Sequence, residues 1–149
     1  MNLFNLPDFL NGRVTRDAYI RWLQRKAVAH VKRDRKRGNA SATISEYKRA
    51  IHHAVCTSKG HDAYTGEASD WSLIRTYDNQ ASKAGRRTYK ALLALLPTVD
   101  HIADGLGAAD FAICSWRTNG AKGDLTLHEF VALCERVVAA NKLAESTHP

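Results

Sequence analysis

The strongest constraint on the fold is a segregation of charge between residues 13–37 and the rest of the chain. Residues 13–37 hold ten Lys or Arg against two Asp, so this segment carries +8 and all the other residues together carry −1. A thin apolar stripe at helical spacing runs through the segment: Ile20, Leu23, Ala27 and Val31. This spacing predicts one helix that packs through a narrow face and carries basic side chains on its other faces.

The ends of this helix and its charge suggest what it contacts. Thr15 is expected to cap its N-terminus, and Gly38 with Asn39 to end it near Arg37. Residues 32–37 offer almost nothing apolar to bury, so we expect them to project from the core or to lie along a ligand. Clustered basic side chains favour a polyanion, because neutralising phosphates releases counterions; the alternative is a solvated face that keeps the protein soluble. A nucleic acid is the favoured partner, and the basic residues expected to contact it are Arg25, Lys32, Arg33, Arg35, Lys36 and Arg37, with Arg117 outside this segment.

The overall composition bounds the class of protein. The 149 residues are 44% hydrophobic and 25% charged, which is enough for one compact domain with a core. No stretch approaches the ~18 apolar residues of a membrane span, and the N-terminus lacks the basic and apolar regions of a secretory signal. The three cysteines are widely spaced, which argues against a disulfide framework and against a zinc ribbon. We expect a cytoplasmic protein, or one in the host cytoplasm if it is phage-encoded, without a structural zinc.

The remaining pattern predicts an α+β fold that is mainly helical. Residues 43–46 form a capping box that predicts a second helix, and the apolar residues 91–96 predict a helix that ends before a proline. Alternation at residues 98–102 and 111–116 predicts the two strands of a hairpin. A second capping box at residues 126–129 predicts a last helix. That helix carries a wide apolar stripe, which we expect to be buried: Leu127, Phe130, Val131, Cys134, Val137 and Val138.

The hairpin and the last helix carry a motif that resembles the HNH endonuclease family. The matching residues are 97–102 (PTVDHI), 110–111 (DF) and 116–126 (WRTNGAKGDLT), and residues 64–67 (YTGE) resemble a segment that many members carry upstream. The resemblance lies in the order of an Asp-His pair, a second strand, an Asn-x-x-Lys-x-Asp segment and a helix. Residues 119–123 are expected to form a turn or a single helical turn.

The resemblance implies a division of the chain. Residues 1–55 would form a basic helical N-terminal region, and residues 56–149 an HNH-like nuclease region within one compact domain. A C-terminal ββα-metal finger would occupy about residues 97–140, held by packing without cysteine pairs around a zinc.

The resemblance also assigns roles to five residues. Asp100 and Asn119 would hold one Mg²⁺ or Mn²⁺, which prefer hard oxygen ligands. His101 would be the general base that deprotonates the attacking water, and Lys122 would contact phosphate. Asp110 stands where the family usually has an Asn that hydrogen-bonds across the finger loop, and an Asp can accept there but cannot donate. Neighbouring strand residues point to opposite faces, so Asp100 and His101 require a strand end or a distorted turn to converge.

The implied activity is metal-dependent hydrolysis of phosphodiester bonds in DNA. One alternative is a non-catalytic nucleic-acid-binding protein with a remnant finger, and another is a basic module that binds an acidic protein. Taken singly, the Asp100–His101 and Asn119–Gly120 pairs are ordinary turn sequences. The presence of Asp100, His101, Asn119 and Lys122 together favours the enzyme.

Overall fold

The computed structural model describes residues 4–75 and 91–146, and side chains as far as residue 142. Within these residues the fold is α+β, with four helices and one two-stranded antiparallel sheet. The elements are a 3-10 helix (Asp8–Leu10), α1 (Arg16–Lys36), α2 (Ile44–Ser58), a second 3-10 helix (Trp71–Arg75), β1 (Pro97–His101), β2 (Phe111–Ser115), α4 (Trp116–Lys122) and α5 (Leu127–Ser146). The chain divides into two compact units, Met1–Asn119 and Gly120–Pro149.

The predicted basic helix is confirmed as α1. Its N-cap is Thr15, whose side-chain oxygen accepts a hydrogen bond from the backbone N–H of Ala18 at 3.1 Å, which satisfies one of the unpaired donors of the first turn. The helix ends at Lys36, and Gly38 then takes a φ of 110°, a conformation that favours glycine. The predicted stripe is largely buried, and Trp22 is buried beside it.

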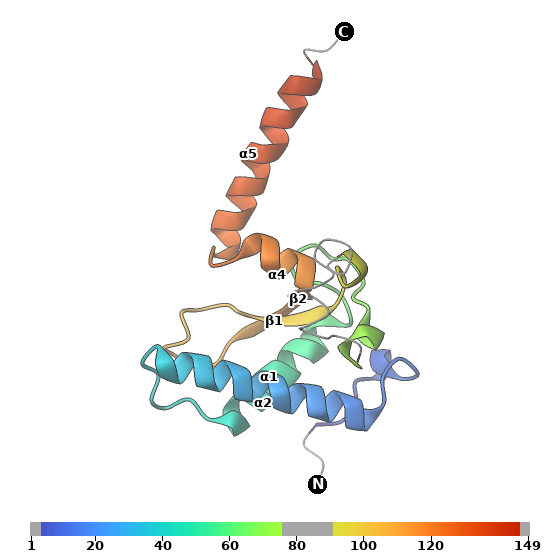
Figure 1. The fold of residues 1–149 in the computed structure, drawn as a ribbon, viewed down its shortest axis with the longest axis vertical. Helices are drawn as coiled ribbons and strands as arrows, with labels where there is room; N and C mark the ends of the chain where they lie inside the picture. The colour runs from blue at the N-terminus through green and yellow to red at the C-terminus, as the bar shows by residue number, and fades with distance from the viewer. Residues whose placement is uncertain (1–3, 76–90, 147–149) are drawn as a thin grey trace. The chain divides into compact units, whose positions relative to one another are not determined.

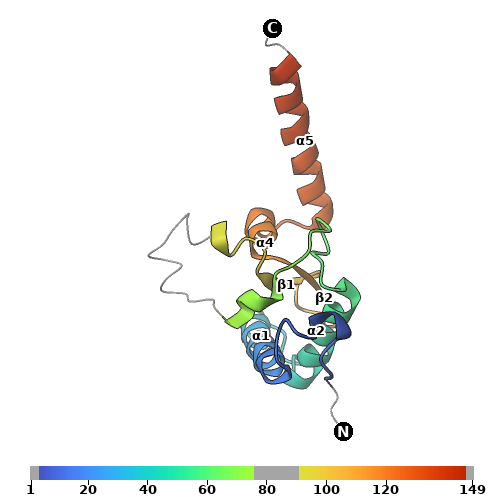
Figure 2. The ribbon, with the colours of Figure 1, turned by 90° about the vertical axis from the view of Figure 1, so that its right-hand side faces the viewer.

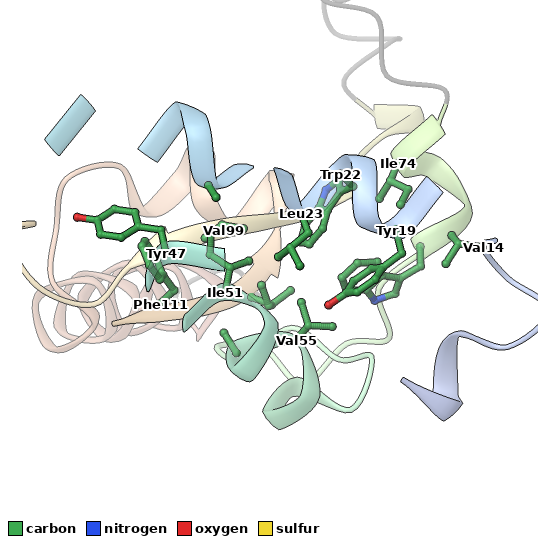
Figure 3. Close-up of a cluster of buried hydrophobic side chains, with 14 of the residues drawn as sticks. Val14, Tyr19, Trp22, Leu23, Tyr47, Ile51, Val55, Ile74, Val99 and Phe111 are labelled. Atoms are coloured by element: carbon green, nitrogen blue, oxygen red, sulfur yellow. The ribbon is translucent and has the colours of Figure 1, made fainter. Parts of the chain in front are cut away.

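The hydrophobic core lies between α1, α2 and one face of the hairpin (Figure 3). The predicted start of α2 is confirmed: the Thr43 side chain caps it by accepting from the N–H of Glu46 at 3.2 Å. The buried face of α2 contributes Tyr47, Ile51, Ala54 and Val55 to the core. The strands add Val99, Phe111 and Ile113. Burying such side chains is the main source of stability for a domain of this size.

The predicted hairpin is present, with each strand ending one residue before its predicted end. β1 and β2 pair with Pro97 opposite Ser115 and His101 opposite Phe111. Both α1 and α2 lie on the same side of this hairpin (Figures 1 and 2). Before β1, residues 91–92 are helical and residues 93–95 form a turn, so the described part of the predicted helix over residues 91–96 is short.

A helix follows the hairpin without an intervening loop. α4 starts directly after β2, where the backbone N–H of Trp116 donates to the carbonyl of Leu96 at 2.8 Å. Residues 119–122 form the second half of α4 and residue 123 follows it. The turn or single helical turn predicted for residues 119–123 is therefore mostly part of a helix of two turns. The order expected from the sequence has a turn between the second strand and the last helix, whereas α4 occupies this place, so the ββα finger over residues 97–140 stays a prediction.

The last helix, α5, confirms its predicted start and corrects its predicted burial. Thr126 and Glu129 form the reciprocal capping box, each backbone N–H donating to the other's side-chain oxygen at 3.1 Å. The predicted buried stripe is wrong, because the side chains of Val131 and Val137 are 46% and 54% exposed and Cys134 is exposed as well. Cys114 is buried. Among the described helices, none combines the length and apolar character that crossing a membrane requires.

Candidate functional site

A buried carboxylate, Asp34, organises the polar groups at the C-terminal end of α1. Its side chain is 0% exposed. The Tyr47 hydroxyl, from α2, donates to Asp34 Oδ2 at 2.6 Å, and His101 Nε2, from β1, lies 2.8 Å from the same oxygen. Arg33 Nε lies 3.5 Å from the other oxygen, Oδ1. A carboxylate removed from water is costly unless such partners offset its charge.

The loop between the two strands joins the same network. Asn39, buried in the turn after α1, donates from Nδ2 to the carbonyl of Gly105 at 2.7 Å. Gly105 has a φ of 83°, and a Cβ built there would lie 2.7 Å from Asp34 Oδ1. Only glycine avoids both the strain and the clash. The network therefore ties α1, α2 and the hairpin loop together around Asp34.

The predicted general base, His101, is a member of this network. Its side chain is 9% exposed, and its ring centroid lies 4.5 Å from that of Phe111 and 5.0 Å from that of His30. Nε2 is buried and close to Asp34, but the N–H direction departs from the straight line of a good hydrogen bond. The imidazole of His101 thus lies with Nε2 beside the Asp34 carboxylate, and Nδ1 is its second ring nitrogen.

The predicted metal ligand Asp100 has a different environment. The Tyr64 hydroxyl donates to Asp100 Oδ2 at 2.6 Å, and burial together with this carboxylate raises the pKa of Tyr64. β1 stays regular through His101, which pairs with Phe111. Because neighbouring strand residues point to opposite faces, Asp100 and His101 project away from each other in this conformation. β1 ends at His101 but keeps its pairing up to that residue, so no distorted turn that would make the two side chains converge is found in the described residues.

The loop that contains Asp62 and Tyr64 forms hydrogen bonds both with α4, the helix that carries Asn119, and with Asp100. Asp62 is buried and accepts hydrogen bonds from the Ser115 N–H at 3.0 Å and from the Thr118 hydroxyl at 2.7 Å. Burial alone would raise the pKa of Asp62, but these hydrogen bonds and those from the following loop N–H groups lower it. Two residues later Tyr64 binds Asp100. The half-buried Asn119 follows Thr118 in α4, so one loop holds together the two elements that carry the predicted ligands.

The donor set suits the ion that the resemblance implies. Mg²⁺ is commonly held by one or two carboxylates with water and phosphate completing its shell, and Asp100 and Asn119 offer hard oxygens of this kind. Within residues 4–75 and 91–146 no three His, Cys, Asp or Glu side chains gather as a metal cluster. An ion held by Asp100 and Asn119 would therefore rely on substrate and water for most of its ligands.

The other predicted catalytic residues are in varied surroundings. Lys122 ends α4, lies in the second compact unit and is buried, with a 6% exposed side chain. Asp110 is exposed, and its backbone carbonyl accepts from the N–H of Ile102 at 3.1 Å. Arg117, expected to contact DNA, forms an exposed ion pair with Glu67, and this contact lowers the pKa of Glu67.

The expectation that residues 32–37 project from the core is wrong for part of that run, because Asp34 is fully buried. Arg33 lies against Asp34, and Arg35 donates from Nε and Nη2 to the carbonyl of Ala42 at 3.1 and 2.8 Å. The exposed basic residues of the run are Lys32, Arg35, Lys36 and Arg37, and Arg33 is half-buried. Asp34 was not predicted as a site residue, because a single acid inside a basic run gives no local sign of its burial.

No family model matches the chain, and no curated protein or solved structure matches it either. The resemblance to the HNH endonucleases therefore stays a prediction, carried by the motif residues themselves.

Proposed function

We propose that this chain binds DNA and hydrolyses its phosphodiester bonds with the help of one Mg²⁺ or Mn²⁺. The observation that supports it best is the constrained imidazole of His101, whose Nε2 lies against the buried carboxylate of Asp34. A carboxylate on one ring nitrogen favours one tautomer and one ring orientation, and an imidazole is the side chain best suited to accept a proton near neutral pH. His101 Nδ1 is the atom that would take the proton from the attacking water.

Asp100 and Asn119 would hold the metal ion, which when bound supplies charge to stabilise the phosphoryl oxygens and to activate water. Tyr64 would orient Asp100 through the hydrogen bond to Oδ2. Because Asp100 and His101 lie on opposite faces of β1, the proposal requires the end of β1 to rearrange when DNA binds. Exposed basic residues of α1, such as Arg25 and Lys32, would neutralise phosphates.

A second candidate is a nucleic-acid-binding protein without catalysis. It is favoured by the same two residues: Asp100 and His101 each have a protein partner, Tyr64 and Asp34, on opposite sides of a regular strand. In that case the Asp34 network would serve only to join α1, α2 and the hairpin.

The test is nicking of supercoiled plasmid in Mg²⁺ or Mn²⁺, with EDTA as the metal-free control. His101→Gln should lower the cleavage rate at least ~10²-fold, the usual effect of losing a general base, while its amide keeps a polar group beside Asp34. The matched control is His128→Gln, the same substitution at an exposed position of α5, which should cleave like the wild type. Thermal unfolding of each variant shows whether the fold is intact.

Several outcomes decide between the two candidates. The enzyme is supported if EDTA abolishes cleavage and if His101→Gln is folded but does not cleave. DNA binding without metal-dependent cleavage in the wild type supports the non-catalytic candidate. Wild-type cleavage by His101→Gln would remove His101 from the mechanism, and unchanged Mn²⁺ affinity in both Asp100→Ala and Asn119→Ala, measured by titration calorimetry, would remove them as ligands.

A further inference from the structure

A groove of about 710 Å³ runs beside the N-terminal half of α1, and we call it the basic groove. Three basic side chains of α1 line it, namely Arg21, Arg25 and Lys26, and Arg75 faces it from the end of the second 3-10 helix. The start of β1 and Trp116 form another part of its wall. Its volume lies within the range of ordinary ligand-binding pockets.

The charges in the basic groove are all of one sign. None of the described residues that line it is acidic. Arg21 and Arg25 are four residues apart on α1, a spacing at which like charges repel. Burial, followed by the charge of Arg25, lowers the pKa of Lys26. A bound anion would relieve this repulsion, so the groove is built to favour a negatively charged ligand.

The apolar lining narrows the choice of anion. Trp116 is half-buried at the start of α4, and Pro97 lies next to it in the wall. A positively charged groove with an aromatic platform is the combination that binds single-stranded nucleic acid, because cations follow the backbone while a base stacks on the ring. A paired duplex keeps its base faces covered and would use the cations alone.

We propose that the basic groove binds a single-stranded segment of nucleic acid, with its phosphates on Arg21, Arg25 and Arg75 and one base against Trp116. This inference rests on the proposed nucleic-acid function and specifies its substrate. It places the contact at the opposite end of α1 from residues 32–37. Pro97 and His101 share one face of β1 and are ~13 Å apart at the usual strand rise, a distance that a few nucleotides span.

The experiment measures binding of a fluorescent oligo-dT and of a matched duplex by anisotropy over a series of NaCl concentrations. The double variant Arg21→Gln/Arg25→Gln should lose at least ~10-fold in affinity for the single strand and flatten the log–log salt slope by ~1.4, or ~0.7 for each lost phosphate contact. The matched control, Arg136→Gln/Lys142→Gln, removes two exposed charges from α5. It should stay within about twofold of the wild type, because charges remote from the contact act only through a screened field.

A second readout reports the base contact. The single strand should quench tryptophan fluorescence in the wild type, and Trp116→Phe should lose that quenching, since Trp22 and Trp71 are buried. Three results would overturn the inference. The groove variant and the α5 control could lose affinity equally, the loss could occur in Lys36→Gln/Arg37→Gln and not in the groove variant, or the duplex could bind more tightly than the single strand. If the groove variant binds normally while plasmid cleavage persists, the groove fails and the proposed function stands. If the wild type neither binds nor cleaves nucleic acid, both fail.

Discussion

Among the described residues α1 and α5 are the two longest helices, of 21 and 20 residues, and their sequences look alike in outline. Each follows a threonine whose side chain bonds the first turn, and each carries apolar side chains at helical spacing. α1 buries its stripe against α2 and the hairpin, whereas most of the stripe of α5 is exposed. Periodicity therefore identifies the apolar face of a helix, but whether another element covers that face depends on contacts distant in sequence.

The same comparison separates the roles of the two helices. Because α1 is fixed by a buried stripe, its outer basic side chains are held in place over β1, where Arg21 and Arg25 line one groove with Arg75. The basic residues of α5, such as Arg136, are scattered on an exposed helix. A binding site requires side chains in a fixed arrangement, and in the described residues α1 provides it.

The largest expected effect is a difference in the free energy of unfolding between substitutions in the apolar stripe of α1 and in that of α5. Leu23→Ala in α1 should lower the free energy of unfolding by about 2–5 kcal/mol, because it leaves a cavity in the core. Val137→Ala in α5 should change it by less than about 0.5 kcal/mol, as exposed substitutions do. Urea denaturation followed by circular dichroism measures both. A comparable loss in the two variants would show that the stripe of α5 is covered, and would break the comparison.

A smaller effect is expected in the pH dependence of stability, where His30 on α1 differs from His128 on α5. Burial, with the nearby charges of Arg33 and Lys26, lowers the pKa of His30 on α1 to about 4. The unfolded chain then binds the proton more readily than the folded one, so this contribution to stability is complete above the ordinary histidine pKa of ~6.5 and is lost as pH falls towards 4. The loss should be on the order of 1–3 kcal/mol.

The measurement is the free energy of unfolding at pH 7 and at pH 4.5. His30→Gln should reduce the difference between the two values, and His128→Gln, on the exposed face of α5, should leave it as in the wild type. The comparison between variants isolates His30 from Asp34 and His101, which share its surroundings. An identical pH dependence in His30→Gln and the wild type would contradict the burial of that imidazole.

The helix ends and the hairpin could be predicted because their signals are local. Thr15, Thr43 and Thr126 each bond a backbone N–H three residues ahead, so the sequence beside each helix is sufficient to place its start. The strands follow from alternation over a few residues. The candidate residues Asp100, His101 and Asn119 were likewise identified from a local motif.

The surroundings of those candidate residues could not be predicted, because they depend on contacts between distant segments. Asp34 reaches His101 from another helix, and Tyr64 reaches Asp100 across 36 positions. Nothing local distinguishes a buried acid from an exposed one in a basic run. The basic groove likewise joins α1 to Arg75 and β1, which only the assembled fold brings together.

The claim that α1 is the nucleic-acid-binding element and α5 is not can be tested most directly by photo-crosslinking. A single-stranded oligonucleotide that carries 4-thiothymidine is irradiated with the full chain, and the crosslinked peptides are identified by mass spectrometry. We expect crosslinks in residues 18–29 of α1 and at Trp116, where the lining of the basic groove lies. Crosslinks concentrated in residues 127–142 of α5, with none along α1, would contradict it.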